Sequence, residues 1–518
     1  MDAEAHYNRG KSLQKLSKDA EAVAAFEAAI ALAPGYAEAY NARGISLFKL
    51  DRARDALASF DRALELNPAY AECHNNRGIV LQELGILDAA LAGFAKAIAL
   101  KPDNARAHNN HGTVLADLRR PRDALVSYDK AIALDPAYAE AFYNRGMALH
   151  DLGRFEDALA SFERAIAVRP DYADAHHNRG AVLQDLLSLE DAIRAYATAA
   201  ALRPDRAESH ANQAYCHLQL GRFEPGWRMH EWRKKLPQPS GNRSFPQPLW
   251  LGREDISNRT LFVHWEQGFG DTIQFCRYGK LLRAMGANVV MSVQEPLYRL
   301  LKQMSPEIAI VHQAEVPEHF DYHCAMMSLP LALGTTLATI PAEPRYIFAD
   351  AALRAGFEAR LPAKTRPRIG LAWQGSATHK NDHYRSIDLD RLAPLLSADS
   401  DWISLQYGAA ASGQDAAWPA KLVSCADAWV DFADAAALID CLDLVITVDT
   451  SVAHLAGAMG KPLFVLLPFN TDWRWLLQRD DSPWYPSARL FRQKPNEPWQ
   501  NVIARVHQAV TKFIKSGA

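Results

Sequence analysis

Small, aromatic and polar positions recur along the first 236 residues with a period of 34. The triplet Asn-Arg-Gly, or a close variant of it, begins at residues 8, 42, 76, 110, 144 and 178. Alanines, aromatics and prolines follow with the same period: Ala22, Ala56, Ala90, Ala124, Ala158 and Ala192; Phe26, Phe60, Phe94, Tyr128, Phe162 and Tyr196; Pro34, Pro68, Pro102, Pro136, Pro170 and Pro204. Because proline cannot donate a helical hydrogen bond, the pattern predicts stacked helix pairs that each end at a proline.

This period and these residues indicate tetratricopeptide (TPR) repeats. The glycine lets the first helix approach its neighbour, the alanine lies where the second helix presses on the first, and the aromatic fills the gap between repeats. A seventh copy begins at Ala207 and departs from the pattern, with Gly226 in place of the alanine and His230 in place of the aromatic. We expect an α-solenoid (TPR superhelix) over residues 1–236, with six full repeats and a degenerate seventh.

Asparagine occupies the sixth place of every repeat except the second: Asn8, Asn76, Asn110, Asn144, Asn178 and Asn212. A primary amide offers a donor and an acceptor together, so it can pair with a peptide backbone. The series resembles the asparagine ladder of the O-linked N-acetylglucosamine transferase superhelix, which implies a protein or peptide partner on the concave face. The alternative is that each asparagine bonds only within its own helix pair.

After a proline-containing linker, short apolar runs alternate with helical stretches, as is typical of parallel α/β folds. The expected strands are Thr260–His264, Asn288–Val293, Arg368–Ala372, Trp402–Gln406, Leu444–Val448 and Pro462–Leu467. A proline-punctuated segment, 341–367, separates two groups of strands. We therefore expect a GT-B arrangement: an N-terminal Rossmann-like acceptor half at 237–348, and a C-terminal Rossmann-like nucleotide-sugar half at 349–518 with a closing C-terminal helix. Ligands of such sheets bind beyond the carboxyl ends of the strands.

The first motif follows the first of these strands and contains Gln267, Gly268, Gly270 and Asp271. The glycines allow a tight turn and a close approach of backbone amides to a ligand. Asp271 stands at the start of a helix. An ordinary strand-to-helix connection can use the same turn, and the third glycine of the dinucleotide fingerprint is absent.

The second motif, Asp449, Thr450, Ser451 and His454, follows the strand Leu444–Val448. Threonine and serine favour the start of a helix, where free N–H groups and the helix dipole attract an anion. His454 lies on the first turn, from where it can hydrogen-bond a diphosphate. The alternative is a capped helix with a satisfied histidine.

The two motifs together resemble glycosyltransferase family 9, the heptosyltransferase-like enzymes, over about residues 258–500. The resemblance implies that Asp271 is the catalytic base and that the helix after Thr450 binds the diphosphate of a nucleotide sugar. It also implies a basic side chain that neutralises phosphate, for which Arg385 is the candidate and Lys380 the rival; the alternative is a surface charge. Glu266 would raise the pKa of the base by like-charge repulsion.

TPR-fused members of that superfamily share further stretches with residues 265–275, 472–475 and 482–486, and flagellin glycosyltransferases have the same domain order. We interpret the aromatic cluster of these stretches as loop packing: Trp473, Trp475, Trp484 and Tyr485. The resemblance implies transfer of a sugar to a Ser or Thr hydroxyl of a protein, flagellin being one candidate. The alternatives are a catalytically inactive scaffold, a sugar-nucleotide 2-epimerase, and a transferase that acts on a lipopolysaccharide-type glycan.

No cofactor and no metal are expected, because GT-B enzymes stabilise the leaving diphosphate with side chains and a helix end; we interpret Asp388-Leu389-Asp390 as helix-start carboxylates. The net charge of −3 does not indicate a nucleic-acid or anionic-membrane partner. Six scattered cysteines without a C-x-x-C pair, together with the absence of a signal sequence or a long apolar run, favour a cytoplasmic protein. The oligomeric state stays open.

Overall fold

The computed structural model describes residues 2–237, 243–375, 382–406 and 422–517. The chain divides into two compact units, Met1–Pro204 and Asp205–Ala518. All six cysteines are free and buried. Within the described residues, no helix combines the length and the apolar character that a membrane crossing requires.

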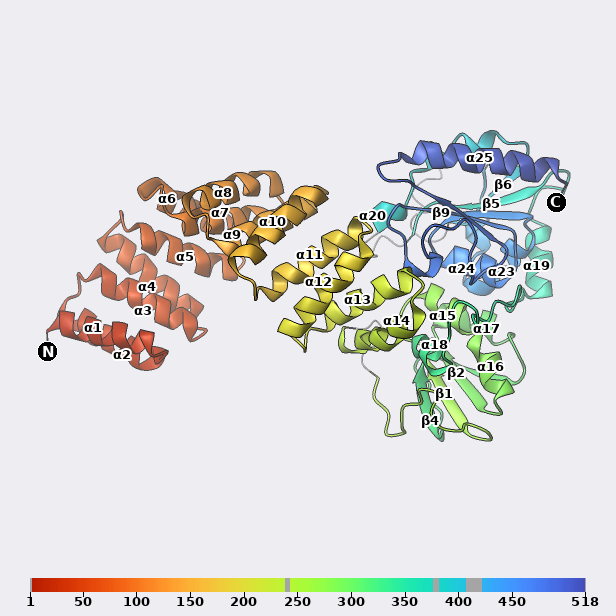
Figure 1. Ribbon diagram of the computed structural model, residues 1–518, viewed down its shortest axis with the longest axis horizontal. Helices are drawn as coiled ribbons and strands as arrows, with labels where there is room; N and C mark the ends of the chain where they lie inside the picture. Colours follow the sequence, from red (N-terminus) through yellow and green to blue (C-terminus); the bar gives the residue numbers. More distant parts are fainter. Residues whose placement is uncertain (1, 238–242, 376–381, 407–421, 518) are drawn as a thin grey trace. The chain divides into compact units, whose positions relative to one another are not determined.

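The first unit consists of six helix pairs (Figure 1). The first helices of the pairs are α1 (Ala3–Lys15), α3 (Ala37–Lys49), α5 (Ala71–Glu83), α7 (Ala105–Asp117), α9 (Ala139–Asp151) and α11 (Ala173–Asp185). The second helices are α2 (Asp19–Leu32), α4 (Ala53–Leu66), α6 (Leu87–Leu100), α8 (Pro121–Leu134), α10 (Phe155–Val168) and α12 (Leu189–Leu202). Each second helix ends just before its periodic proline, so the predicted α-solenoid is confirmed.

The periodic glycine makes room for the aromatic ring of its own repeat. A Cβ added at Gly78 would lie 2.8 Å from the ring of Phe94, and the other five repeats show the same approach. Phe94 is fully buried and shares an apolar cluster with Val114 of the next repeat. The ring therefore packs within a repeat as well as between repeats.

Arginines that follow the sixth-place asparagine link neighbouring repeats through ion pairs. Arg77 lies 2.6 Å from Asp61, and Arg145 lies 2.7 Å from Asp129 of the preceding second helix. Arg179 makes the equivalent contact with a glutamate at 3.0 Å. We call this contact the arginine clamp.

The clamp is missing between the third and fourth repeats. His111 replaces the arginine, and Ala95 stands where the acid would be. The Nδ1 atom of His111 lies 3.0 Å from the Oγ atom of Ser127 in its own repeat. An open groove of about 570 Å³ lies here, lined among others by Ala95, His111 and Val126.

The second unit begins with a seventh, shorter helix pair, α13 (Ala207–Gln219) and α14 (Phe223–His230), followed by η1 (Glu231–Lys235). A four-stranded parallel sheet follows, with strand order β3-β2-β1-β4. Its strands are β1 (Thr260–His264), β2 (Asn288–Val293), β3 (Ile308–His312) and β4 (Tyr322–Ala325). Its helices are α15 (Phe269–Phe275), α16 (Tyr278–Ala284), α17 (Glu295–Leu301), η2 (Met326–Ser328) and α18 (Leu329–Ala332). Helix α19 (Ala351–Glu358) follows in the chain and packs against a helix of the second sheet.

The second sheet has six parallel strands in the order β10-β9-β8-β5-β6-β7. They are β5 (Arg368–Ala372), β6 (Asp401–Ser404), β7 (Leu422–Val423), β8 (Leu444–Val448), β9 (Leu463–Leu467) and β10 (Ala488–Arg492). The helices are α20 (Asp382–Arg385), α21 (Leu389–Leu392), η3 (Leu395–Ser397), η4 (Ala426–Ala428), α23 (Phe432–Asp440), α24 (Ser451–Ala458), η5 (Trp473–Trp475) and α25 (Trp499–Lys515). Helix α25 packs on one face of this sheet, and α23 and α24 pack on the other (Figure 1).

The predicted fold class, a TPR α-solenoid followed by an α/β region with two parallel sheets consistent with GT-B, is confirmed. The three domain boundaries stay a prediction. Both sheets have a point where the strand order reverses: β1 lies between β2 and β4, and β5 lies beside β8. Ligands of parallel sheets bind at the carboxyl ends of strands at such points. The two predicted motifs follow β1 and β8, and the candidate Arg385 comes after β5 in the chain.

Candidate functional site

The turn after β1 presents Asp271 on the first turn of α15. The Oδ2 atom of Asp271 accepts a hydrogen bond of 2.8 Å from the backbone N–H of Gly268. The backbone carbonyl of Gln267 accepts a 2.8 Å bond from the side-chain amide of Gln294, which fixes the turn from the neighbouring strand. The Asp271 side chain is 17% exposed. A carboxylate is therefore held in a nearly closed site at the end of the central strand.

The turn after β8 begins α24 at Ser451, and the Oγ1 atom of Thr450 accepts a hydrogen bond from the N–H of Val452. His454 is buried, its Nδ1 atom lies 2.9 Å from the hydroxyl of Tyr485, and its ring stacks on Trp475. Burial, assisted by nearby arginines, lowers the pKa of His454 well below its ordinary value. The imidazole is therefore neutral at physiological pH.

The two motifs, one from each sheet, meet directly. A Cβ atom added at Gly270 would lie 2.7 Å from the Cδ2 atom of His454 and 3.4 Å from its Nε2 atom. Real Cβ atoms do not approach a ring carbon so closely, so only glycine permits this contact between α15 and α24. The structure thus brings together Asp271 and His454, which are 183 positions apart in the sequence.

Arg474 joins the two sides and was not predicted. Its guanidinium forms an ion pair with Asp271 and donates hydrogen bonds to Asp472 Oδ1 (2.9 Å) and Gln274 Oε1 (2.8 Å). The Arg474 side chain is only 11% exposed. The sequence offered one signal, an arginine between two tryptophans directly after an aspartate, but its partner Asp271 is distant in the chain.

Two carboxyl groups of the site have raised pKa values. Burial raises the pKa of Asp271; Arg474 opposes this effect, Asp472 reinforces it, and Glu266 adds less than Asp472. The carboxylate that most raises the pKa of Asp271 by like-charge repulsion is therefore Asp472, and the expected neighbour, Glu266, contributes less. Burial and Asp472 raise the pKa of Asp449 to about 6, against the opposing charges of Arg385 and Arg474. A carboxyl group that titrates near neutral pH is suited to proton transfer.

Arg385 lies beside the second motif. Its Nη1 atom donates a 2.8 Å hydrogen bond to the backbone carbonyl of Asp449, and its Nε atom lies 3.0 Å from Asp382. The guanidinium is thus fixed next to the start of α24, where an anion would bind. The rival, Lys380, lies outside the described residues.

The four aromatics that we interpreted as loop packing are buried, with exposed fractions of at most 2%: Trp473, Trp475, Trp484 and Tyr485. Their burial agrees with the interpretation that they pack the loops. Trp475 and Tyr485 also contact His454, so this packing supports the histidine.

The sixth-place asparagines bond across repeats. Asn76 donates a hydrogen bond of 3.1 Å to the fifth-place Asn41 of the preceding repeat, and Asn110 contacts Asn75 in the same way. Asn144 donates to Asn109, and Asn178 donates to Tyr143. Asn8 is exposed, and Asn212 lies in the second unit. The alternative interpretation supposed that each asparagine bonds only within its own helix pair, whereas these four bond to the preceding repeat. Peptide binding by the series stays a prediction.

Comparisons with known proteins agree with this organisation. Residues 427–507 match glycosyltransferase family 9 (heptosyltransferase), and tetratricopeptide repeat families match residues 3–36, 41–105, 122–153, 146–186 and 177–224. The chain therefore combines TPR repeats with a region that matches family 9 glycosyltransferases. The matched region contains Asp449, His454 and Arg474, whereas Gly268–Asp271 lies outside it.

One relative and two solved structures are similar to parts of the chain. Protein FlbA of Caulobacter vibrioides is 26% identical over 328 residues, which are 58% of this chain and 54% of FlbA, so the chain spans about half the length of that relative. The crystal structure of YrrB, a TPR protein with an unusual peptide-binding site, covers 36% of this chain and 95% of its own, at 28% identity and a TM-score of 0.31. The crystal structure of PilW, a type IV pilus biogenesis factor, covers 39% of this chain and 93% of its own, at 24% identity and a TM-score of 0.37.

Proposed function

We propose that this protein transfers a sugar from a nucleotide sugar to a serine or threonine hydroxyl of a protein held by the TPR array. The observation that carries the proposal is the contact between Gly270 and His454, which places the carboxylate of the first motif beside the helix start of the second. A glycosyltransferase needs a base for the acceptor next to a binding site for the departing diphosphate.

The donor diphosphate would bind at the start of α24, where the hydroxyls of Thr450 and Ser451 and the positive end of the helix dipole lie. Arg385 is fixed beside this helix start and supplies positive charge. The neutral ring of His454 presents its Nε2 edge toward Gly270, because its Nδ1 atom bonds Tyr485. These groups stabilise the charge that develops on the leaving diphosphate.

Asp271 would accept the proton of the acceptor hydroxyl as the oxygen attacks the anomeric carbon and the bond from that carbon to the diphosphate breaks. Its raised pKa makes it a better base than an exposed aspartate. The ion pair with Arg474 has to loosen for this step, and Arg474 then provides a second cation for the diphosphate. Asp449 remains beside the helix start as a second titrating group.

The acceptor side of the proposal depends on the TPR array. Arrays of this kind offer extended surfaces for other proteins, and the asparagine series adds amides at regular intervals. Flagellin is the first acceptor to test, because the domain order resembles that of flagellin glycosyltransferases.

The test begins with donor binding. We expect one class among UDP-, GDP-, ADP- and CMP-sugars to raise the melting temperature of the wild type and to have little effect on His454→Ala. His319→Ala is the matched control, since that side chain is 92% exposed, and it should respond like the wild type. A well-folded wild type that responds to no donor would favour the inactive scaffold.

The transfer itself is tested with a labelled donor of the class so identified. Label should appear on acceptor protein with the wild type and fall by at least about a hundredfold with Asp271→Asn. Label on a lipid-linked glycan would redirect the proposal to a lipopolysaccharide-type acceptor, and donor turnover without any acceptor would point to an epimerase.

A further inference from the structure

The seventh helix pair departs from the repeat pattern in sequence and in structure. Helix α14 has 8 residues, whereas the second helices of the six full repeats have 14. His230 occupies the place of the aromatic and is buried between Tyr215 and Trp227. This helix pair belongs to the unit Asp205–Ala518, which also contains both sheets. Its contacts therefore concern the candidate site itself.

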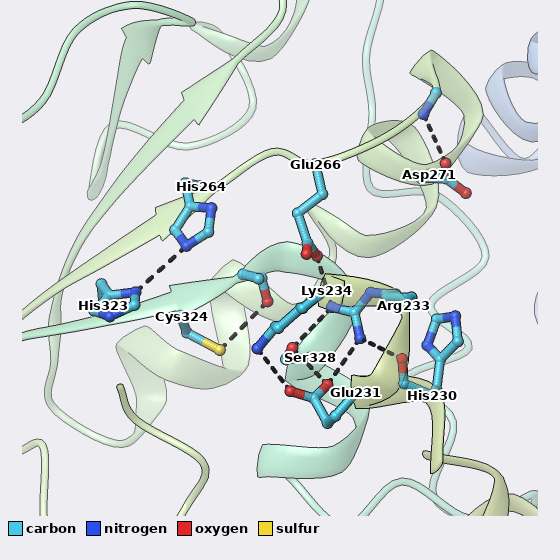
Figure 2. A network of polar contacts seen from close by, with 12 residues as sticks. His230, Glu231, Arg233, Lys234, His264, Glu266, Asp271, His323, Cys324 and Ser328 are labelled. Carbon is cyan, nitrogen blue, oxygen red and sulfur yellow. Dashed lines mark hydrogen bonds and ion pairs between the residues drawn. The ribbon is translucent and has the colours of Figure 1, made fainter. Parts of the chain in front are cut away.

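Arg233 of η1, which directly follows this helix pair, contacts the loop that leads from β1 to Asp271. Arg233 is fully buried, and its Nη2 atom donates hydrogen bonds to Glu266 Oε2 (2.7 Å) and Ser328 Oγ (2.9 Å). Its Nη1 atom donates to Glu231 Oε1 at 2.8 Å. Figure 2 shows this network beneath the loop, with Glu266 pointing down to Arg233 and Asp271 farther along the same chain segment. Although burial opposes it, the two carboxylates raise the pKa of Arg233, so the group is always charged.

A second contact reaches the loop that carries Arg474. The side-chain amide of Gln219, at the end of α13, donates to the backbone carbonyl of Thr471 at 2.7 Å and to Asn470 at 3.2 Å. Gln219 is 3% exposed. Trp227 of α14 packs edge to face against Trp473 at 5.2 Å. The seventh helix pair and the following η1 thus hold both loops whose side chains form the Asp271–Arg474 pair.

We infer that Gln219 and Arg233 are positioning residues for the Asp271–Arg474 pair. Displacement of the loop would leave buried Arg233 with only one of its two carboxylate partners, so the Arg233–Glu266 contact resists that displacement. Gln219 fixes the loop that carries Arg474 by bonding the backbone carbonyl of Thr471, so a substitution of the Thr471 side chain would not remove this contact. Catalytic groups work only when their supports hold them to a fraction of an ångström.

The effect of these two residues on catalysis rests on the proposed function. Their effect on the positions of the two loops does not depend on it. The last TPR pair, together with η1, is accordingly a support of the site rather than a detachable spacer. Loss of residues 205–236 would remove the supports of both loops, even though none of the proposed donor-binding groups and no base belongs to that segment.

Hydrogen exchange of the full-length chain tests the structural part. In Arg233→Met, we expect the amides of residues 265–271 to exchange at least about tenfold faster than in the wild type. In Gln219→Leu, the faster exchange should appear at residues 470–475. The matched control is Arg368→Met, because Arg368 is also buried and lies 2.7 Å from Glu358. Arg368 is the first residue of β5, whereas the candidate site lies at the carboxyl ends of the strands. That control should affect its own surroundings and leave both loops unchanged.

Unchanged exchange at residues 265–271 in Arg233→Met would overturn the inference. If this variant does not fold, Glu266→Gln weakens the same contact while keeping its shape, and the same segment should respond. These readouts need no catalytic activity, so a failure of the proposed function remains distinguishable from a failure of the inference.

Kinetics test the catalytic part once a donor is known. Arg233→Met should lower kcat by at least about tenfold, leave the Kd of the donor within about twofold, and shift the acid limb of the pH–rate profile. Arg233→Lys should recover part of kcat, because it restores the charge. Equal losses of kcat in Arg233→Met and Arg368→Met, with an unchanged pH profile, would show a merely structural effect and overturn the positioning assignment.

Discussion

The raised pKa of Asp449 has a measurable consequence for stability. The pKa of this carboxyl is about 6 in the folded protein, against 3.8 as its ordinary value. The folded state therefore binds more protons than the unfolded state between these values, so wild-type stability falls as pH rises through this window. The difference of about 2 pKa units corresponds to about 3 kcal/mol of the free energy of unfolding. The wild type has this contribution below about pH 4 and loses it as the pH rises through about 6.

Asp449→Asn removes the titrating group and its repulsion with Asp472. We expect the variant and the wild type to be about equally stable near pH 4. The free energy of unfolding of the variant should then exceed that of the wild type by about 3 kcal/mol at pH 7.5. The amide side chain could also change the free energy of unfolding by an amount that is the same at every pH, and such a change would leave the pH dependence of the difference unaltered.

The assay is urea unfolding followed by tryptophan fluorescence at pH values from 4 to 8. All 12 tryptophans lie after residue 204, so the signal reports on the second unit alone. The control is Asp388→Asn, since that side chain is 74% exposed and the substitution should change stability by less than about 0.5 kcal/mol. A stability difference between Asp449→Asn and the wild type that does not vary with pH would refute the reasoning.

Three further variants test other contacts. Gly270→Ala should lower the free energy of unfolding by about 1–3 kcal/mol and abolish the donor-induced thermal shift, because its Cβ meets a histidine ring at 2.7 Å; the control Gly356→Ala, whose Cβ meets nothing within 4 Å, should stabilise its helix slightly. Arg474→Met should cost about 3–5 kcal/mol in fluorescence-detected unfolding, since two carboxylates lose their cation, and wild-type stability would contradict the ion pair. Ala95→Asp combined with His111→Arg should restore the arginine clamp and raise stability by up to about 1 kcal/mol in melting followed by circular dichroism, whereas a loss would show that the groove needs its present residues.

The strands that the sequence predicted and those it missed differ in their place in the sheets. The six predicted strands are all interior, and β1, β2, β5 and β8 have the predicted bounds. The four missed strands, β3, β4, β7 and β10, are all edges. An interior strand of a parallel sheet is covered on both faces and forms a continuous apolar run, whereas an edge strand is partly exposed and mixes polar with apolar residues.

The site shows a similar division. Residues that follow strands, such as Asp271 and His454, could be predicted because parallel sheets place ligands at the ends of their strands. Arg474 and Arg233 could not be predicted, since each acts through a tertiary contact with a partner far away in the chain. No periodicity marks a lone arginine, so only the folded structure identifies its carboxylate.

The missing clamp between the third and fourth repeats makes the mechanics of the solenoid uneven. In a stack where each repeat touches only its neighbours, cooperativity passes from one repeat to the next through their shared interfaces. We expect an interface that has His111 and Ala95 in place of an ion pair to transmit less of this cooperativity. Opening or bending of the array should then be easier at this interface than at those that carry the clamp. A long partner that spans the interface would have to align the repeats on either side of it, so the length of the bound segment would become part of what the array recognises.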